Sequence, residues 1–468
     1  MNAMDFETSQ KLLDHWLTPQ DHLSVDDSGT LCIEGHSARD LVEKYGSPLF
    51  VMSERTLRDN YRRIRAPFTG RWPQPVNVMY AIKANPNIAI RAILGEEGAG
   101  GDCFSMGELY ATFEGGADPA KIVVNGSWKS DEIIAKAIEH GVCINMDSEE
   151  EVDAIERVAA AMDKPVPVAI RIKVLPEKYF ADFKSDCFKR PDFFGAMRRS
   201  KWGETLPAAE RIIKRLKDHQ HVRMFGYHTH VGRASKDPAM FAAVGGELAA
   251  TIAELHTRTG FAPTMVDLGG GWARERDPEA SGQLRNLNPI EDYAEAVCAQ
   301  MRRVFEEGAC PLPELWLEPG RYIVGNAGVF LTSIGLIKKD ADLGYTWINV
   351  DSSTNNLPQV DLFGYTYMVM AAEKMKRPLS HPADVVGQTC VPSIFGKDVA
   401  LPKMEEGDLI AVLDAGMYAE AKGHQFNSLP RPATALVSGE LSWLIRRRET
   451  LQDVFGTMVV PERFAKRG

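Results

Sequence analysis

The sequence has few cysteines, and they are widely spaced. Seven cysteines occur among 468 residues, without a Cys-x-x-Cys pair or a close Cys/His cluster. Structural zinc ligands and disulfide frameworks recur at short, characteristic spacings, so neither is expected here. We predict reduced thiols, most of them, such as Cys143 and Cys298, small buried residues of the core.

The chain also lacks a dense basic run and a long hydrophobic run. Lys and Arg number 54 against 64 Asp and Glu, a net charge of -10. No positive stripe can therefore follow a phosphate backbone, and nucleic acid is not an expected partner. No stretch approaches the roughly 20 apolar residues that span a bilayer, and the N-terminus MNAMDFETSQ is polar rather than a signal peptide. We predict a soluble, cytoplasmic protein without a membrane partner.

The composition is that of an ordinary globular protein, and the chain is long. Hydrophobic residues make up 44% and charged residues 25%, the range of proteins that bury a core. The length of 468 residues exceeds that of a common single domain. Two domains, or one large barrel with a satellite, are therefore expected.

Short apolar runs alternate with longer segments of helical period between residues 76 and 320. This alternation is typical of parallel strands joined by crossover helices. Eight such strands favour an α/β fold of the (β/α)8 barrel type over an open doubly wound sheet. The predicted strands are 76–84, 100–105, 121–126, 142–147, 166–174, 223–231, 264–271 and 314–320.

The pattern changes after about residue 325. Short β-like runs broken by Gly, Pro, Asn and Asp follow, which predicts a mostly antiparallel β domain over 326–468. Residues 30–53 also read as strands and are expected to join this domain. The barrel is then expected over 54–325, and residues 1–29 are predicted to form a helical extension.

Lys83 is the first chemically distinctive residue at a strand end. It lies at the C-terminal end of the first predicted strand, among Ala, Ile and Ala, at the mouth where barrels of this class carry out chemistry. Partial desolvation there favours the neutral amine, which can condense with a carbonyl group. Taken alone, Lys83 is equally compatible with a surface lysine on a loop.

Two later strand ends also offer functional groups. The seventh ends in Gly269–Gly271, whose backbone N–H groups can approach a phosphate closely, although a plain tight turn is the alternative. The eighth presents Glu318 and Arg321 on a Pro-Gly corner, either as an ordinary ion pair or as partners of a charged heterocycle.

The sixth strand end carries two histidines. His228 and His230 have period-two spacing, which predicts that they lie on the same side of the strand. A two-histidine metal pair has to be considered at that spacing. Because no partner carboxylate or third histidine can be placed beside them, no metal is expected.

Ten motifs in a fixed order connect these strand ends. They run from YAIKANPN through GAGGDCFSMGEL, VNGSWKSDEI, INMDSEEE, SKWG, HTHVGR, DLGGGW and EPGRYIVGNAG to a Cys390 segment and DAGMY. With them the chain resembles the fold-type III pyridoxal-phosphate enzymes, specifically the diaminopimelate and ornithine decarboxylase branch, from about residue 30 to residue 440. The resemblance implies an alanine racemase-like fold, pyridoxal 5'-phosphate as cofactor, and decarboxylation of an amino acid.

The resemblance also implies roles for individual residues. Lys83 matches the lysine that forms a Schiff base with the cofactor, His230 the histidine that stacks on its ring, and Glu318 the carboxylate that pairs with the ring nitrogen. Cys390 matches a catalytic cysteine that the partner subunit inserts, which implies a homodimer with composite active sites. The implied cofactor-binding set is Lys83, Asp102, Arg171, His230, Arg233, Gly269, Gly270, Gly271, Glu318, Arg321 and Tyr418.

Glu318 discriminates between reaction types. An anionic carboxylate beside the pyridine nitrogen keeps that nitrogen protonated, which makes the ring a strong electron sink for the carbanion left by departing CO2. The racemase branch of the fold instead pairs the nitrogen with an arginine. We therefore favour a carboxy-lyase over a racemase or epimerase, and over a non-catalytic homologue, which has no need of an electron sink.

Three departures from the family pattern bear on the substrate. Arg233 stands where the family has a phosphate-binding serine. The family's Arg-Pro-x-x-Tyr stretch, which binds the carboxylate at the far end of the substrate, is replaced by a region with Asp361 and Tyr365, which favours a cationic group there. Val391 replaces a glutamate that would hold an ammonium group at the same end. We therefore predict a diamino acid or a derivative of one, without strict diaminopimelate specificity. The predicted substrate-binding set is Arg321, Asp361, Tyr365 and Cys390.

The segment at 175–199, between the fifth and sixth predicted strands, is long, aromatic and basic. Loops of this length inside a barrel usually carry function. It is a candidate to receive an anionic or larger substrate, with a solvated basic loop as the alternative.

Overall fold

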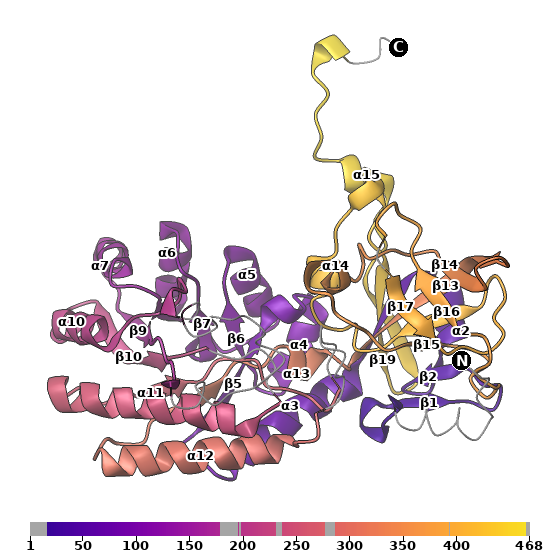
Figure 1. Cartoon of the computed structure of the whole chain (residues 1–468). Coiled ribbons are helices and arrows are strands. Elements are labelled where there is room, and N and C mark those ends of the chain that lie inside the picture. The colour runs from indigo at the N-terminus through magenta and orange to yellow at the C-terminus, as the bar shows by residue number, and fades with distance from the viewer. Residues whose placement is uncertain are drawn as a thin grey trace. The chain divides into compact units, whose positions relative to one another are not determined.

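The computed structural model describes residues 16–177, 195, 198–230, 236–276, 286–392 and 394–464. The chain divides into two compact units (Figure 1). One unit lies within residues 57–325. The other combines segments from within 1–56 and 326–468, so its chain is interrupted by the first unit.

The first unit is a closed barrel of eight parallel strands, as the sequence predicts. Each strand lies beside the next strand of the chain, and β12 closes the ring against β5. Right-handed crossovers through helices produce this order, since parallel neighbours cannot be joined by a hairpin. The strands are β5 (Val76–Ala81), β6 (Gly100–Cys103), β7 (Ile122–Val124), β8 (Cys143–Met146), β9 (Val166–Arg171), β10 (Val222–His228), β11 (Met265–Asp267) and β12 (Glu314–Leu317).

The barrel interior is packed with side chains. Met79, Val123, Cys143, Met265 and Trp316 form a buried cluster drawn from five of the strands. A filled interior is the usual state of an eight-stranded barrel. Polar groups at the carboxyl ends of the strands, here called the barrel mouth, therefore lie above a buried apolar interior.

The helices between the strands begin and end at residues suited to their ends. In α6 (Asp131–His140) the Ser130 side chain accepts from the Ile133 N–H at 3.4 Å, and Gly141 ends the helix at φ +72°. The other helices of this part are α3 (Glu54–Thr69), α4 (Ile88–Glu96), α5 (Met106–Glu114), α7 (Glu151–Met162), α10 (Leu206–Leu216), α11 (Pro238–Thr259), α12 (Ile290–Glu307) and α13 (Arg321–Val324).

Helix α11 corrects one expectation. By length and composition it is apolar enough to cross a membrane, although no such stretch was expected. Its apolar character reflects burial within the barrel unit, where it lies beside α12 (Figure 1). An added Cβ at Gly246 would lie 2.7 Å from the Gln300 side chain, so glycine allows the two helices to approach closely. We read α11 as a core helix.

The second unit contains the predicted, mostly antiparallel sheet. Its nine strands run in the order β17-β16-β14-β13-β4-β19-β20, with β18 pairing with β13 and β15. Strand β4 comes from the N-terminal part of the chain and pairs with β13 and, in parallel, with β19. The strands are β4 (Leu49–Ser53), β13 (Gly328–Asp340), β14 (Tyr345–Val350), β15 (Val369–Ala371), β16 (Ala383–Val386), β17 (Ile394–Val399), β18 (Leu409–Val412), β19 (Ala433–Ser438) and β20 (Leu441–Arg446).

The N-terminal part differs from the expected helical extension. Strand β1 (Leu23–Val25) pairs with β2 (Leu31–Ile33), and β3 (His36–Ser37) completes a separate three-stranded sheet. The intervening Asp-Asp-Ser-Gly turn explains the difference, because the Asp26 carboxylate accepts from the Thr30 N–H at 2.9 Å and Gly29 has φ +87°. Of the strands expected over 30–53, only β4 thus enters the large sheet. Residues 1–15 lie outside the described residues.

Candidate active site

Lys83 lies just beyond the end of β5, in a single 3-10 turn (Ile82–Ala84). Its Nζ donates to the carboxylate of Asp102, at the end of the neighbouring strand β6, and lies 4.5 Å from the centre of the Phe104 ring. The Lys83 side chain is 34% exposed whereas the Asp102 side chain is completely buried. The amine is thus held at the barrel mouth by one buried charge, which differs from the apolar surroundings suggested by the sequence.

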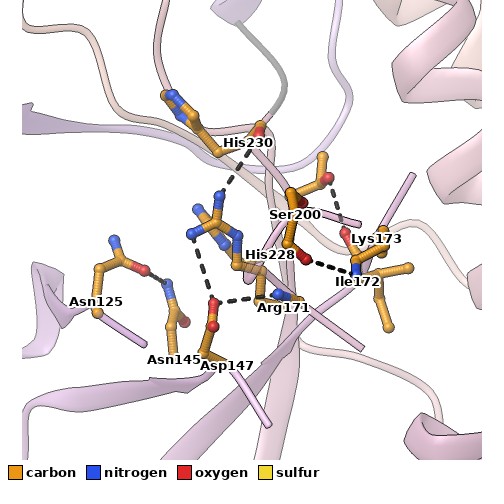
Figure 2. Close-up of polar contacts among 12 residues, drawn as sticks. Asn125, Asn145, Asp147, Arg171, Ile172, Lys173, Ser200, His228 and His230 are labelled. Atoms are coloured by element: carbon orange, nitrogen blue, oxygen red, sulfur yellow. Dashed lines mark hydrogen bonds and ion pairs between the residues drawn. The ribbon is translucent and has the colours of Figure 1, made fainter. Parts of the chain in front are cut away.

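A chain of hydrogen-bonded side chains crosses the mouth from Asp102. Asn125 Nδ2 donates to Asp102 Oδ1 at 2.8 Å and to Glu318 Oε1 at 2.7 Å. Asn145 Nδ2 in turn donates to Asn125 Oδ1 at 2.9 Å (Figure 2). The sequence analysis missed both asparagines. The signal that could have found them is a buried amide at or just beyond the end of an apolar strand, since such a group needs a polar partner.

Glu318 is buried and anionic. Besides Asn125, His228 Nε2 lies 3.4 Å from Glu318 Oε2. Burial alone would raise the pKa of Glu318, but the charges of His228 and Lys83 and the hydrogen bond from His228 hold it well below its ordinary range. The Glu318 carboxylate therefore offers a buried negative charge at the barrel mouth.

His230 is neutral and packs against the glycine loop. Its Nδ1 accepts from the Gly270 N–H at 3.0 Å. Burial, reinforced by the positive charge of Lys83, lowers the pKa of His230 to about 3. An added Cβ at Gly269 would lie 2.6 Å from His230 Nδ1, and one at Gly270 would lie 2.2 Å from the Glu318 carbonyl oxygen. Only glycine allows this close approach of the loop to both residues.

Replacing Gly270 with alanine is expected to weaken cofactor retention by about tenfold or more, since the methyl group must displace the loop or the Glu318 backbone, a strain of about 1–3 kcal/mol. Cofactor remaining after dialysis, read from its absorption, measures the effect. Gly107→Ala is the matched control, because Gly107 is exposed in α5 and its nearest atom would be Ser105 Oγ at 3.9 Å. Equal retention in both variants would contradict the close packing of this loop.

Arg171 brings a guanidinium to the same region. Figure 2 shows it between Asp147, at 3.6 Å from Nη1, and the His230 carbonyl oxygen, at 3.5 Å from Nη2. Its guanidinium also lies 4.6 Å from the centre of the Trp202 ring. Burial lowers the pKa of Arg171, while the Asp147 charge opposes that effect. Arg171 therefore supplies a fixed positive charge beside His230.

His228 and His230 have different partners. Strand β10 ends at His228, so the alternation of strand side chains does not extend to His230. Contrary to expectation, His228 does have carboxylate neighbours. Among the described residues, His228, Asp267 and Glu318 form the set whose candidate ligand atoms lie close enough to hold a metal ion, within 4.8 Å of one another. Glu318 already accepts two hydrogen bonds there, and the absence of a metal stays a prediction.

The remaining predicted site residues are distributed as follows. Arg321 begins α13 directly after Gly320, where an added Cβ would lie 3.0 Å from Ala84 in the turn of Lys83. Arg233 and most of the 175–199 segment lie outside the described residues. Four predicted residues belong to the second unit, namely Asp361, Tyr365, Cys390 and Tyr418.

These four residues differ in their surroundings. Cys390 is exposed and its Sγ donates to Asn427 Oδ1 at 3.6 Å. Tyr418 has φ +53°, and Lys422 Nζ lies 5.3 Å from the centre of its ring. Asp361 is exposed on α14 (Gln359–Phe363), and Tyr365 packs against the core of this unit.

The residues at the barrel mouth fit pyridoxal phosphate. Lys83 would offer an amine to the aldehyde, Glu318 an anion to the ring nitrogen, and His230 an uncharged ring to the pyridine face. The backbone of Gly269–Gly271 and the Arg171 guanidinium provide groups that favour a phosphate. Each requirement of the cofactor is thus matched by a group with the appropriate charge.

Comparison with known proteins agrees with this chemistry. The family model described as pyridoxal-dependent decarboxylase, pyridoxal binding domain, matches residues 55–325. The diaminopimelate decarboxylase of Methanothermobacter thermautotrophicus is 33% identical over 95% of this chain and 99% of its own length, and that of Pseudomonas aeruginosa is 30% identical over 92% and 98%. A crystal structure of the M. jannaschii diaminopimelate decarboxylase with L-lysine covers 96% of this chain and 100% of its own, at a TM-score of 0.87 and 28% identity.

Proposed function

The chain belongs to the pyridoxal-dependent decarboxylase family, and from this premise we propose that Lys83 holds the cofactor covalently while the enzyme removes the α-carboxylate of a diamino acid. The protein is a pyridoxal-phosphate-dependent carboxy-lyase. The main support for this proposal is the buried Glu318 anion. Glu318 accepts hydrogen bonds from Asn125 and His228, and it lies at the opposite end of the hydrogen-bonded network from Lys83.

Each residue of the barrel mouth has a defined task in this proposal. When bound, pyridoxal phosphate supplies an electron sink for the electron pair that departing CO2 leaves on the α-carbon. Glu318 holds a negative charge at the ring nitrogen, and His230 packs on the ring face as a neutral group. Asp102 orients Lys83 through their ion pair. Loss of CO2 leaves the α-carbon in need of one proton, and Lys83 Nζ is the proposed donor.

The proposed substrate is diaminopimelate or a derivative of it. The similar proteins are named for diaminopimelate, and one solved relative holds L-lysine, which is diaminopimelate less one CO2. Distal recognition is assigned to Arg321, Asp361, Tyr365 and Cys390, because the family's distal arginine is absent. Exposed Asp361 is proposed to attract the cationic end of the substrate.

We also propose that the enzyme is a homodimer of the cytoplasm, with Cys390 completing the partner's site. Exposed apolar side chains at the end of the second unit support self-association. They include Leu441, Trp443 and Leu444 on β20, the last strand of the sheet path, and Leu451 and Phe455 on α15 (Leu451–Phe455). Large apolar side chains that remain exposed in one chain are often covered by a partner.

CO2 release by the purified, cofactor-loaded protein tests the proposal. The substrates compared are meso-diaminopimelate, L- and D-lysine, L- and D-ornithine, arginine and carboxylated conjugates of these. We expect release from diaminopimelate or one of its derivatives, and a mass in solution corresponding to two chains. Racemisation without CO2, or no reaction with any compound despite bound cofactor, would overturn the proposed function.

A further inference from the structure

Asp267 is a buried carboxyl group to which the mechanism above gives no task. It ends β11, is completely buried, and its Oδ1 accepts from the Gly269 N–H at 2.8 Å. Within the part of the chain that the structure describes, its Oδ2 has no hydrogen-bond donor. One of its carboxyl oxygens lies within 4.8 Å of a carboxyl oxygen of Glu318, which is also buried.

Two buried carboxyl groups this close together do not both ionise readily. Ionised carboxylates are acceptors only, so two of them repel each other and neither can donate. Burial strengthens the repulsion, and one member of such a pair stays protonated. The proximity of buried Asp267 and Glu318 therefore points to a hydrogen on one of the two.

The hydrogen-bond donors decide which group keeps the hydrogen. Glu318 accepts from Asn125 Nδ2 at 2.7 Å and lies 3.4 Å from His228 Nε2, and both interactions favour its ionised form. Asp267 accepts only a backbone N–H, at Oδ1. In agreement with this difference, burial and the Glu318 charge raise the pKa of Asp267 well above its ordinary value.

Asp102 is the competing carrier of the hydrogen. It is also buried, and burial together with the Glu318 charge raises its pKa. However, Asp102 accepts from the side-chain amide of Asn125, a donor that remains when Lys83 holds the cofactor, and it also accepts from the Lys83 ammonium while that amine is free. The negative charge of Asp267 would thus be stabilised by fewer hydrogen-bond donors than that of Asp102.

We propose that Oδ2 of Asp267 carries a hydrogen and donates it to the Glu318 carboxylate. Asp267 then acts as a positioning residue that makes Glu318 a weaker base, so that a proton shared between Glu318 and the cofactor's ring nitrogen stays on the nitrogen. This effect on the cofactor rests on the role proposed for Glu318. The location of the hydrogen does not depend on it.

Infrared spectroscopy of the holoenzyme locates the hydrogen directly. A protonated carboxylic acid gives a carbonyl stretching band separate from those of carboxylates, and this band shifts in deuterium oxide. We expect the band in the wild type and in Asp102→Asn, and its loss in Asp267→Asn. Its absence from the wild type, or its persistence in Asp267→Asn, would overturn the assignment.

The pair Asp267→Asn and Asp267→Val separates a hydrogen-bond role from packing. Asparagine keeps an acceptor for the Gly269 N–H and offers an N–H to Glu318, so its kcat is expected within about threefold of the wild type. Valine can make neither hydrogen bond. Its kcat is therefore expected to fall by about tenfold or more, with little change in KM. With cofactor labelled at its ring nitrogen, 15N NMR is expected to show a protonated nitrogen in the wild type and Asp267→Asn, and partial deprotonation in Asp267→Val.

An unchanged nitrogen signal in Asp267→Val would refute the effect on the cofactor. The infrared result is independent of turnover, so it stands or falls separately from the proposed decarboxylation. If the protein is inactive on all substrates but the carboxylic acid band is assigned to Asp267, the result counts against the proposed function and not against the location of the hydrogen.

Discussion

Replacing Lys83 with alanine abolishes CO2 release, with an expected loss of about 1,000-fold or more, and removes the visible absorption of covalently held cofactor. The reason is that the variant has no amine at the point where the barrel mouth presents one to a carbonyl group. The absorption spectrum after dialysis and the rate of CO2 release measure the two effects. A variant with full activity would contradict the assignment of Lys83.

Two comparisons make the Lys83 result specific. Lys136→Ala removes an exposed lysine whose ion pair with Glu139 spans 2.8 Å on the surface of α6, so cofactor and activity are expected unchanged. Lys83→Ala also leaves Asp102 without its ammonium partner, but Asp102 retains Asn125 and can take up a proton. The thermal unfolding temperature should therefore show a folded variant, and a collapse of folding would demand a different explanation for the lost activity.

The second large effect concerns Glu318. Glu318→Gln is expected to slow decarboxylation more than tenfold while the cofactor still binds, because an amide keeps the acceptor for Asn125 but cannot hold a proton on the ring nitrogen. The measurement is kcat at saturating substrate together with the amount of cofactor per chain.

A residue at the start of the strand that leads to Glu318 supplies the control. Glu314 begins β12, at the opposite end from the mouth, and accepts from Asn77 Nδ2 at 3.1 Å and from Trp316 Nε1 at 3.2 Å. Glu314→Gln can keep an acceptor for these donors, so its kcat is expected to match that of the wild type. Equal rates for the two variants would show that the partner of the ring nitrogen has been misplaced.

The fold is largely predictable because its periodicities are local. Apolar runs separated by amphipathic helices predict the parallel barrel, and the short broken runs after residue 325 predict the second sheet. The error near the N-terminus concerns a hairpin whose strands are only three residues long, too short for an alternation to be visible. There the Asp26–Gly29 turn was the more informative signal.

The site was predictable only in part, because its contacts cross the barrel. Lys83 and Glu318 stand out as charges at the ends of apolar strands. Asn125, just beyond β7, donates to Glu318, just beyond β12, although these strands are not neighbours, so the contact depends on barrel closure rather than on sequence spacing. Asp267 was missed for the same reason, and His228 was noted without its partner Glu318, because that buried carboxylate lies far away in the sequence.

The position of β4 has a consequence for biosynthesis. Met52 of β4 pairs with Gly328 of β13, so more than half of the 468 residues must leave the ribosome before this partner exists. All residues of β4 are buried in the folded protein, but until then the strand has no sheet to pair with. It is therefore exposed to chaperones and to aggregation. Folding of the barrel during synthesis shortens the effective loop between β4 and β13 and lowers the entropic cost of closing it. Synthesis in this order thus allows an already folded barrel to lower the cost of completing the sheet of the second unit.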